Sequence, residues 1–253
     1  MSQPAKSMIA VRDLTIGYGD RAVLEGVNFE VRRGEVFAIL GASGSGKSTL
    51  LKHMIGLYRP MRGDILISGE SLVVAEGDER LRILRKFGVL YQGGALFGSL
   101  TTVENVRLPL DEFTDLSEVA KDLIALSKLR LVGLEAAATK LPADLSGGMQ
   151  KRAGIARAIV MDPCVLFLDE PSAGLDPITS AGLDALIREL AQGLGITFVM
   201  VTHELPSIFS VADRVVVLDP KARGIVAEGT PAWLREHATQ PWVRQFLNRE
   251  VAA

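Results

Sequence analysis

Residues 41–49 read GASGSGKST, a glycine-rich segment that fits the pattern G-x-x-x-x-G-K-[ST]. The fixed positions are Gly41, Gly46, Lys47 and Ser48. The segment follows the apolar run VFAIL and opens a stretch with helical periodicity, which is the strand–loop–helix context that the pattern requires. Gly44 and Gly46 allow backbone angles that bring N–H groups around a phosphate, and the start of a helix adds further donors. A chance match of four positions occurs in roughly one chain per hundred of this length, so the context favours a phosphate-binding loop over a plain glycine turn.

Two further segments end in side chains that suit phosphate chemistry. Residues 165–170 read VLFLDE, so an apolar strand is followed by two carboxylates at the strand end where open α/β sheets bind ligands. Lys47 is expected to reach the β- and γ-phosphates and Ser48 to ligate Mg²⁺. Asp169 suits the Mg²⁺ shell, directly or through water, and Glu170 suits a general base. An apolar run ending in Asp-Glu is common by itself, and only the nearby phosphate loop favours the functional interpretation.

His203 also follows an apolar run, TFVMVT, at a predicted strand end. An isolated histidine there is more often structural, but the shared sheet edge makes a γ-phosphate contact plausible. His53 and His237 have no such context and receive no role.

Composition narrows the class of protein. The 253 residues are enough for one large domain or two small lobes, and 28 basic minus 30 acidic residues give a net charge of −2, so no strong field attracts nucleic acid. The single cysteine, Cys164, excludes an internal disulfide framework and a multi-cysteine zinc site. The first residues lack the apolar core of a secretion signal, and the uncharged stretch 87–103 is too polar to span a bilayer. A mean hydropathy of +0.25 still allows association with a membrane. We expect the protein to lie in the reducing cytosol, docked to another component.

Apolar runs that alternate with helical patterns predict an α/β fold with a largely parallel sheet. The expected strands are 8–16, 36–40, 65–68, 88–91, 165–168, 197–201 and 214–218, with helices at 47–56 and 178–194. Residues 101–141 contain no convincing strand, and 116–131 has apolar residues at helical spacing, so residues 93–160 are interpreted as a helical lobe inserted into the core. The segment from Pro231 onward predicts one or two amphipathic helices, whose usual role is packing on the core.

Residues 145–150 read LSGGMQ and are followed by KRAGIARAIVMDP. Ser146 is expected to cap a helix whose first turn contains Gly147 and Gly148, which is a second anion-binding arrangement. Together with the phosphate loop and VLFLDE, this segment closely resembles the signature of ABC-transporter ATPases. The resemblance covers nearly the whole chain. It implies a P-loop NTPase core with a mostly parallel sheet, an N-terminal antiparallel β subdomain and an inserted α-helical subdomain, in a domain spanning 1–237 with a C-terminal interaction tail at 238–253.

The same resemblance assigns roles to residues that the motifs alone leave open. Tyr18, in IGYGD, would stack on adenine, and Gln92, in VLYQGG, would sense Mg²⁺ and the attacking water. Asp176, in SAGLD, would communicate across a dimer, and His203 would be the switch histidine. The expected ATP contacts are Tyr18, Gly41, Ser43, Gly44, Gly46, Lys47, Ser48 and Thr49, with Ser146, Gly147 and Gly148 from a second copy. The catalytic set is Glu170, His203, Gln92 and Lys47, and the Mg²⁺ set is Ser48, Gln92 and Asp169. Met149 stands where many members have glutamine, and that position should tolerate the change.

The resemblance further implies that two copies pack head to tail with ATP between the phosphate loop of one and the signature of the other. The run ALFGSLTTVENVRLPL, the segment LSGGMQKR and the closing WVRQFLNRE look most like the ATPase of Mla-type, Mce-associated phospholipid transporters. In that group the C-terminal extension reaches the neighbouring ATPase, so residues 240–250 are interpreted as an interaction tail instead of core packing. The implied partners are a transmembrane permease, a STAS-domain protein and a periplasmic Mce-domain protein, with no nucleic acid. The expected location is the cytoplasmic face of the bacterial inner membrane.

Other functions share part of this pattern. The ATPase of an amino-acid or other small-solute importer would have every catalytic motif named above. An ABC ATPase of DNA repair would carry long coiled-coil insertions, and one that acts on ribosomes would carry two cassettes; this sequence has neither. A regulatory module without hydrolysis is disfavoured because Lys47, Asp169, Glu170 and His203 are all present.

Overall fold

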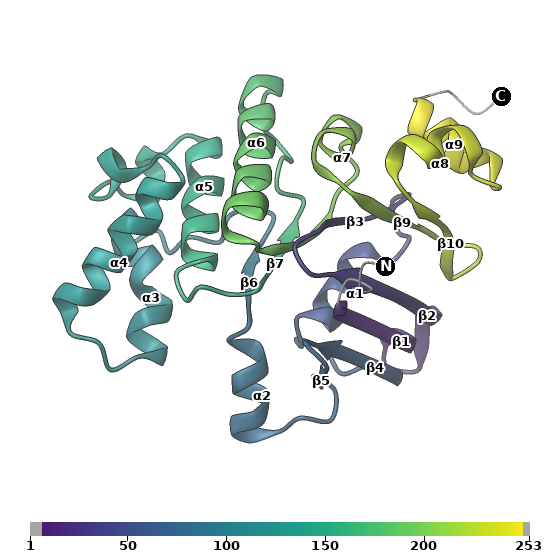
Figure 1. Ribbon diagram of the computed structural model, residues 1–253, viewed down its shortest axis with the longest axis horizontal. Helices are drawn as coiled ribbons and strands as arrows, with labels where there is room; N and C mark the ends of the chain where they lie inside the picture. Colours follow the sequence, from purple (N-terminus) through teal and green to yellow (C-terminus); the bar gives the residue numbers. More distant parts are fainter. Residues whose placement is uncertain (1–6, 250–253) are drawn as a thin grey trace, which may run out of the picture.

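Two β-sheets and a set of helices make up the chain, of which the computed structural model describes residues 7–249 (Figure 1). The first sheet is antiparallel and has the order β2-β1-β4-β5. Its strands are β1 (Ser7–Tyr18), β2 (Arg21–Arg32), β4 (Arg62–Ile67) and β5 (Glu70–Ser71). The antiparallel N-terminal subdomain expected from the family resemblance is therefore present.

The second sheet has the order β10-β9-β3-β8-β7-β6 and is parallel except for its edge strand β10. Its strands are β3 (Val36–Gly41), β6 (Phe87–Leu90), β7 (Val165–Asp169), β8 (Thr197–Val201), β9 (Arg214–Asp219) and β10 (Gly224–Gly229). Every residue of β3 and β8 is buried, as expected for parallel strands that are covered on both faces.

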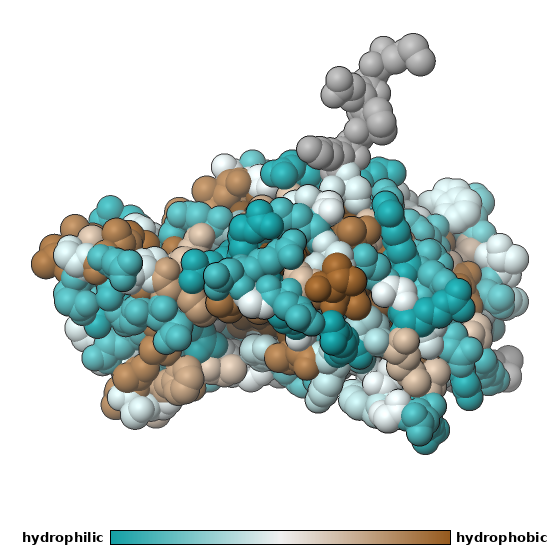
Figure 2. All heavy atoms as spheres, turned by 90° about the horizontal axis from the view of Figure 1, so that it is seen from below, coloured by the Kyte–Doolittle hydropathy of each residue, from teal (hydrophilic) through white to brown (hydrophobic). Residues whose placement is uncertain are grey.

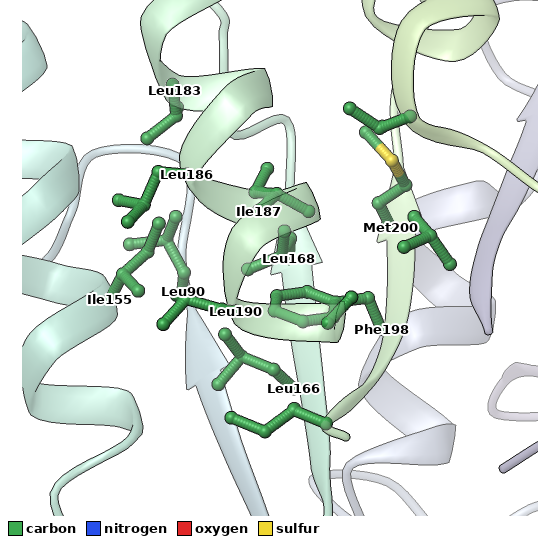
Figure 3. Packing of buried hydrophobic residues seen from close by; sticks show 14 of the residues in the cluster. Leu90, Ile155, Leu166, Leu168, Leu183, Leu186, Ile187, Leu190, Phe198 and Met200 are labelled. Carbon is green, nitrogen blue, oxygen red and sulfur yellow. The ribbon is translucent and has the colours of Figure 1, made fainter. Parts of the chain in front are cut away.

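Alternate residues of the central strands enter two different cores. Leu166, Leu168, Phe198 and Met200 face a core shared with α6 (Pro177–Leu194), which covers one side of the sheet. Figure 3 shows Leu183, Leu186, Ile187 and Leu190 of α6 packed over these strand residues. Their neighbours Phe167, Val199 and Val201 face the other core, which the antiparallel sheet and α1 (Lys47–Met54) complete. The strands are thus fixed from both sides, and so are the loops at their ends.

The remaining helices surround the sheets, with α3, α4 and α5 toward one end of the molecule and α8 and α9 near the other (Figure 1). They are α2 (Gly77–Leu84), α3 (Thr102–Phe113), α4 (Glu118–Leu131), α5 (Gly147–Ala158), α7 (Leu205–Val211), α8 (Pro231–His237) and α9 (Pro241–Asn248), with 3₁₀ turns at Glu135–Ala137 and Pro142–Asp144. Helices α3 and α4 form a lobe at the end of the molecule, and no strand interrupts residues 101–141. Helix α5 joins this lobe to the sheet, because Ile155 lies in the same core as Leu90 of β6 (Figure 3).

The C-terminal helices pack on the core with one face. Leu234 of α8 and Val243 and Leu247 of α9 are buried in the cluster that also contains α6. Residues 240–250 were expected to form an interaction tail instead of core packing. This is wrong for Val243 and Leu247, because burial of their apolar side chains in the core stabilises the fold by removing apolar surface from water. The predicted tail boundary at 238–253 and the domain start at residue 1 include residues 1–6 and 250–253, which lie outside the described part of the chain.

A helix that crosses a bilayer must be long and almost wholly apolar. Within residues 7–249, no helix of this chain is both long enough and apolar enough to do so. The face in Figure 2 is mostly hydrophilic, with apolar side chains scattered over it and a group of them at the end formed by α3 and α4.

Candidate nucleotide site

Three loops meet at the C-terminal edge of the parallel sheet. Strand β8 lies between β3 and β7, with Ile39 of β3 and Asp169 of β7 both in register with Val201. The loop 41–49, the carboxylates after β7 and His203 after β8 therefore start from adjacent positions. The backbone N–H of Glu170 donates to the carbonyl of Val201 at 2.8 Å, which fixes the end of β7 against β8.

The loop between β3 and α1 depends on glycine. Gly44 and Gly46 have φ values of +78° and +93°, in the left-handed region that side chains with a Cβ avoid. Gly46 is also the residue before α1, and a Cβ there would lie 2.9 Å from Cγ1 of Val23. Ser43 and Ser48 are exposed, whereas Gly41 is buried at the end of β3. The conformation that the motif predicts is therefore the one that the chain adopts.

Lys47 is held close to this loop. Its Nζ donates to the carbonyl oxygens of Gly41 at 2.8 Å and Ala42 at 3.0 Å. Burial lowers the pKa of Lys47, and the charge of Glu170 partly offsets that shift. A lysine in this position can neutralise phosphate oxygens that the loop amides bind.

Glu170 and His203 form a direct pair. Oε1 of Glu170 lies 2.8 Å from Nδ1 of His203, and Oε2 of Glu170 is buried without a hydrogen-bond partner. Glu170 itself has a φ of +46°, an uncommon conformation for a non-glycine residue. Such a carboxylate, oriented by a histidine and with one oxygen left over, has the features of a general base.

Asp169 offers a carboxylate for a cation. Burial raises its pKa, the neighbouring Glu170 raises it further, and Lys52 and Lys151 lower it. A cation near Asp169 would offset both of the effects that raise this pKa. The carboxylate of Asp169, the hydroxyl of Ser48 and the amide oxygen of Gln92 would give Mg²⁺ the hard oxygen ligands that it prefers. The residues present therefore fit the metal.

Lys151 was not singled out by the sequence, because a lysine in a helix usually lies in solvent. Here it is 5% exposed, and its Nζ donates to the carbonyl of Gln92 and to that of Glu170 at 3.2 Å. Burial lowers the pKa of Lys151, and the carboxylates Asp169 and Glu170 oppose that shift. The signature helix α5 is therefore tied to both Gln92 and Glu170, although the side chain of Gln92 remains exposed.

The signature residues start α5 as predicted. The Oγ of Ser146 accepts a hydrogen bond from the N–H of Met149 at 3.3 Å, so Ser146 is the N-cap. A Cβ on Gly148 would overlap Cγ2 of Thr179, the residue whose Oγ1 donates to Asp176 at 2.5 Å. Among the described residues, no hydrogen bond joins Ser146, Gly147 or Gly148 to the loop 41–49 of the same chain.

Tyr18 lies at the end of β1, with its side chain half exposed and its hydroxyl 3.3 Å from Oγ1 of Thr49. The ring of Tyr58 meets the ring of Tyr18 edge-on, with centroids 5.7 Å apart. Tyr58 was not predicted, and only its position shortly after α1 could have suggested it. The two tyrosines leave a face of Tyr18 beside the phosphate loop, where a base could stack.

A groove of about 630 Å³ begins next to Gln92, because Tyr91 is part of its lining. It is lined mainly by apolar side chains of α2, β6, α3 and the segment after Gln92, including Phe97 and Phe113, and its charged lining residues are Arg85, Glu112 and Arg157. Phe97 is 58% exposed, and the guanidinium of Arg85 lies over the ring of Phe113 at 5.1 Å.

Comparisons with known proteins agree with this geometry. A family model described as "ABC transporter" matches residues 24–173. MlaF of Escherichia coli strain K12, an intermembrane phospholipid transport system ATP-binding protein, is 38% identical over 248 residues, which are 98% of this chain and 91% of MlaF. The probable ribonucleotide transport ATP-binding protein mkl of Mycobacterium leprae is 42% identical over 97% of this chain and 70% of mkl. Among solved structures, the dimeric ATP-binding cassette MJ0796 bound to ADP and Pi matches with a TM-score of 0.79 and 32% identity, over 88% of this chain and 98% of that one.

Proposed function

The chain belongs to the ABC transporter family, and from this premise we propose that it is the ATPase subunit that energises phospholipid transport between bacterial membranes through a separate permease. The observation that carries the proposal is the length of the match to MlaF, which includes 98% of this chain. MlaF of Haemophilus influenzae adds a second relative of the same name, 39% identical over 97% of this chain and 92% of that protein.

The chemistry is hydrolysis of ATP to ADP and phosphate with Mg²⁺, as in the family. Loop 41–49 binds the phosphates, and Lys47 neutralises their charge. Glu170, oriented by His203 at 2.8 Å, takes the proton of the attacking water. When bound, Mg²⁺ supplies charge stabilisation, and Ser48, Asp169 and Gln92 would hold it, Asp169 through water.

A complete site requires a second copy. The signature residues Ser146, Gly147 and Gly148 form no hydrogen bond to the phosphate loop of their own chain among the described residues. In our proposal they bind the ATP held by the other copy, and Asp176 communicates between the two. The solved structures of MJ0796, a cassette that is 32% identical to this chain, are dimeric and support this arrangement.

The groove lined by Phe97 and Phe113 is the proposed contact with the permease. It adjoins Tyr91 and the segment after Gln92, the region that contacts the coupling helix of the permease in the family. We further propose a STAS-domain protein and a periplasmic Mce-domain protein as partners, no nucleic acid, and a peripheral location on the cytoplasmic face of the inner membrane.

A small-solute importer is the second candidate, and it is favoured by the similarity to mkl, which is described as a probable ribonucleotide transport ATP-binding protein. The ATP site does not separate the two candidates, because an ABC ATPase does not touch the cargo. The partners do separate them.

The test is to purify the tagged full chain from detergent-solubilised native membranes and to identify co-purifying proteins and lipids by mass spectrometry. Phospholipid transport predicts a permease together with an Mce-domain protein, a STAS-domain protein and bound phospholipid. A permease with a solute-binding protein and no Mce-domain protein would contradict it and assign the chain to a small-solute importer. A Phe97→Glu variant purified in parallel controls for carry-over of abundant membrane proteins.

A further inference from the structure

Three buried polar side chains lie on the segments that follow β7 and β8 and on α6. Ser172 follows Glu170 by two residues, Ser207 lies on α7 four residues after His203, and Asp184 lies on α6. Their exposed fractions are 3%, 0% and 4%. Ser172 is the first residue of SAGLD, but the sequence assigned no role to it, and the hydrolytic scheme above uses none of the three.

Ser172 and Ser207 contact each other directly. Oγ of Ser207 donates to Oγ of Ser172 at 3.3 Å, and both oxygens are buried. Burial raises the pKa of Asp184, and the hydroxyl of Ser207 and the charge of Arg188 offset part of the shift. Oδ1 of Asp184 is buried without a partner. A buried carboxyl with one unpaired oxygen is costly, and an apolar side chain would fill the same place at less cost.

The hydrogen bond between Ser172 and Ser207, here called the link, joins two segments that carry site residues. The segment from Glu170 to Asp176 passes Ser172, and Asp176 is the N-cap of α6, the helix that carries Asp184. Helix α7 begins two residues after His203. Two side-chain hydrogen bonds join these segments in the described part of the chain, the contact between Glu170 and His203 and the serine pair, and the serine pair is the buried one.

We propose that Ser172 and Ser207 are positioning residues that hold α7, and with it His203, against the segment from Glu170 to Asp176. The link acts on the orientation of the pair Glu170–His203 and not on the phosphate loop, which is attached to β3 and α1. Its loss should therefore lower kcat and leave the KM for ATP nearly unchanged. This inference rests on the roles proposed above for Glu170 and His203.

The test measures steady-state ATP hydrolysis by the full chain in the complex in which it purifies, together with thermal unfolding. Ser207→Ala and Ser172→Ala remove the same bond from its two ends, so each should lower kcat about tenfold with KM within about twofold. The double variant should be no worse than either single variant, because residues that act as one unit are not additive.

Thr197→Val is the matched control. It removes another buried hydroxyl, which accepts a hydrogen bond from Gly34 at the opposite end of β8. This variant should lose stability and keep its kcat. The proposal is overturned if the serine variants keep kcat within about twofold of wild type, or if their effects on kcat simply multiply in the double variant.

The failure of this inference differs from that of the proposed site roles. If Glu170 is not the general base, Glu170→Gln retains turnover. If only the link is absent, Glu170→Gln is inactive while the serine variants hydrolyse ATP at the wild-type rate.

Discussion

Oε1 of Glu170 lies 2.8 Å from Nδ1 of His203, so the residues that follow β7 and β8 meet directly at the edge of the parallel sheet. The contact leaves Oε2 of Glu170 buried and without a hydrogen-bond partner. The contact also fixes the direction of the carboxylate, and Glu170 itself has a left-handed backbone conformation. The pair is the part of the site on which the proposed hydrolysis depends most directly.

Replacement of Glu170 with Gln should stop hydrolysis and leave ATP binding intact. The amide keeps the size of the side chain but cannot take a proton from water, and general-base catalysis contributes about 10²- to 10⁴-fold in rate. The variant should therefore show a kcat lower by at least about 10² and should accumulate as a closed dimer with ATP, detectable by size-exclusion chromatography. Glu189→Gln changes an exposed carboxylate of α6 and serves as the control, since its kcat should remain at the wild-type level. Hydrolysis by Glu170→Gln at the wild-type rate would remove Glu170 from the role of base.

Gly148 should not accept even an alanine, for a steric reason. A Cβ at this position would overlap Cγ2 of Thr179. Gly148→Ala is expected to lower the free energy of unfolding by about 1–3 kcal/mol, the usual cost of overpacking. Thr179→Ser lacks the methyl group but keeps the hydroxyl that donates to Asp176, so it should restore most of the loss in the double variant. Denaturant unfolding of the four chains measures this, and a double variant as unstable as Gly148→Ala would show that the methyl group is not the cause.

Asp176, the N-cap of α6, should make the thermal stability of the fold depend on pH in the acid range. Hydrogen bonds from the side chain and backbone of Thr179 hold the pKa of Asp176 below its usual value. Because the folded-state pKa is lowered, this stabilisation is fully present above the unfolded pKa of about 3.9 and is lost as the pH falls through the folded value. Asp176→Ala should thus have a lower melting temperature than wild type at neutral pH, and the difference should shrink as the pH falls below about 4. Asp176→Asn keeps an uncharged acceptor, so its difference from Asp176→Ala should not vary with pH.

The proposed contact with the permease can be tested through Phe97. Its ring is more than half exposed in the groove, and a charge there would be costly to bury under a partner helix. Phe97→Glu should reduce the amount of co-purified permease at least about fivefold and leave the affinity for ATP unchanged. Leu123→Glu places the same charge on α4, at a side chain that is 63% exposed and lies outside the groove. Equal recovery of permease with Phe97→Glu and wild type would contradict the assignment of the groove.

The sequence predicts the parallel strands and the phosphate loop well, because both leave local patterns. Strands such as β8 are continuous apolar runs, and the loop needs glycines at fixed spacing. Strand β2 was not predicted individually, since Glu25 and Gly26 interrupt its alternation, and the edge strand β10 is bounded by glycines and has no fully buried residue.

Side-chain links between distant segments leave no such pattern. The carbonyl of Gln92 that Lys151 binds is 59 residues away, and Ser172 lies 35 residues before Ser207. Their burial is decided by where the sheet places β6, β7 and β8, and no period or spacing encodes it. For the same reason the apolar stripe of the last helices could be interpreted either as core or as a contact with a partner.

Leu247 distinguishes the two interpretations of the C-terminal helices. Its side chain is 3% exposed in the cluster that contains α6, so Leu247→Ala should lower the free energy of unfolding by about 2–4 kcal/mol. Glu236→Ala, at an exposed position of α8, should change it by less than about 0.5 kcal/mol. Because Leu247 is remote in sequence from the loop 41–49, the KM for ATP should stay within about twofold of wild type in both variants. Denaturant unfolding and ATP titration measure these quantities on the full chain. If Leu247→Ala kept wild-type stability but lost its partners on purification, α9 would act through contacts between proteins and not through the core.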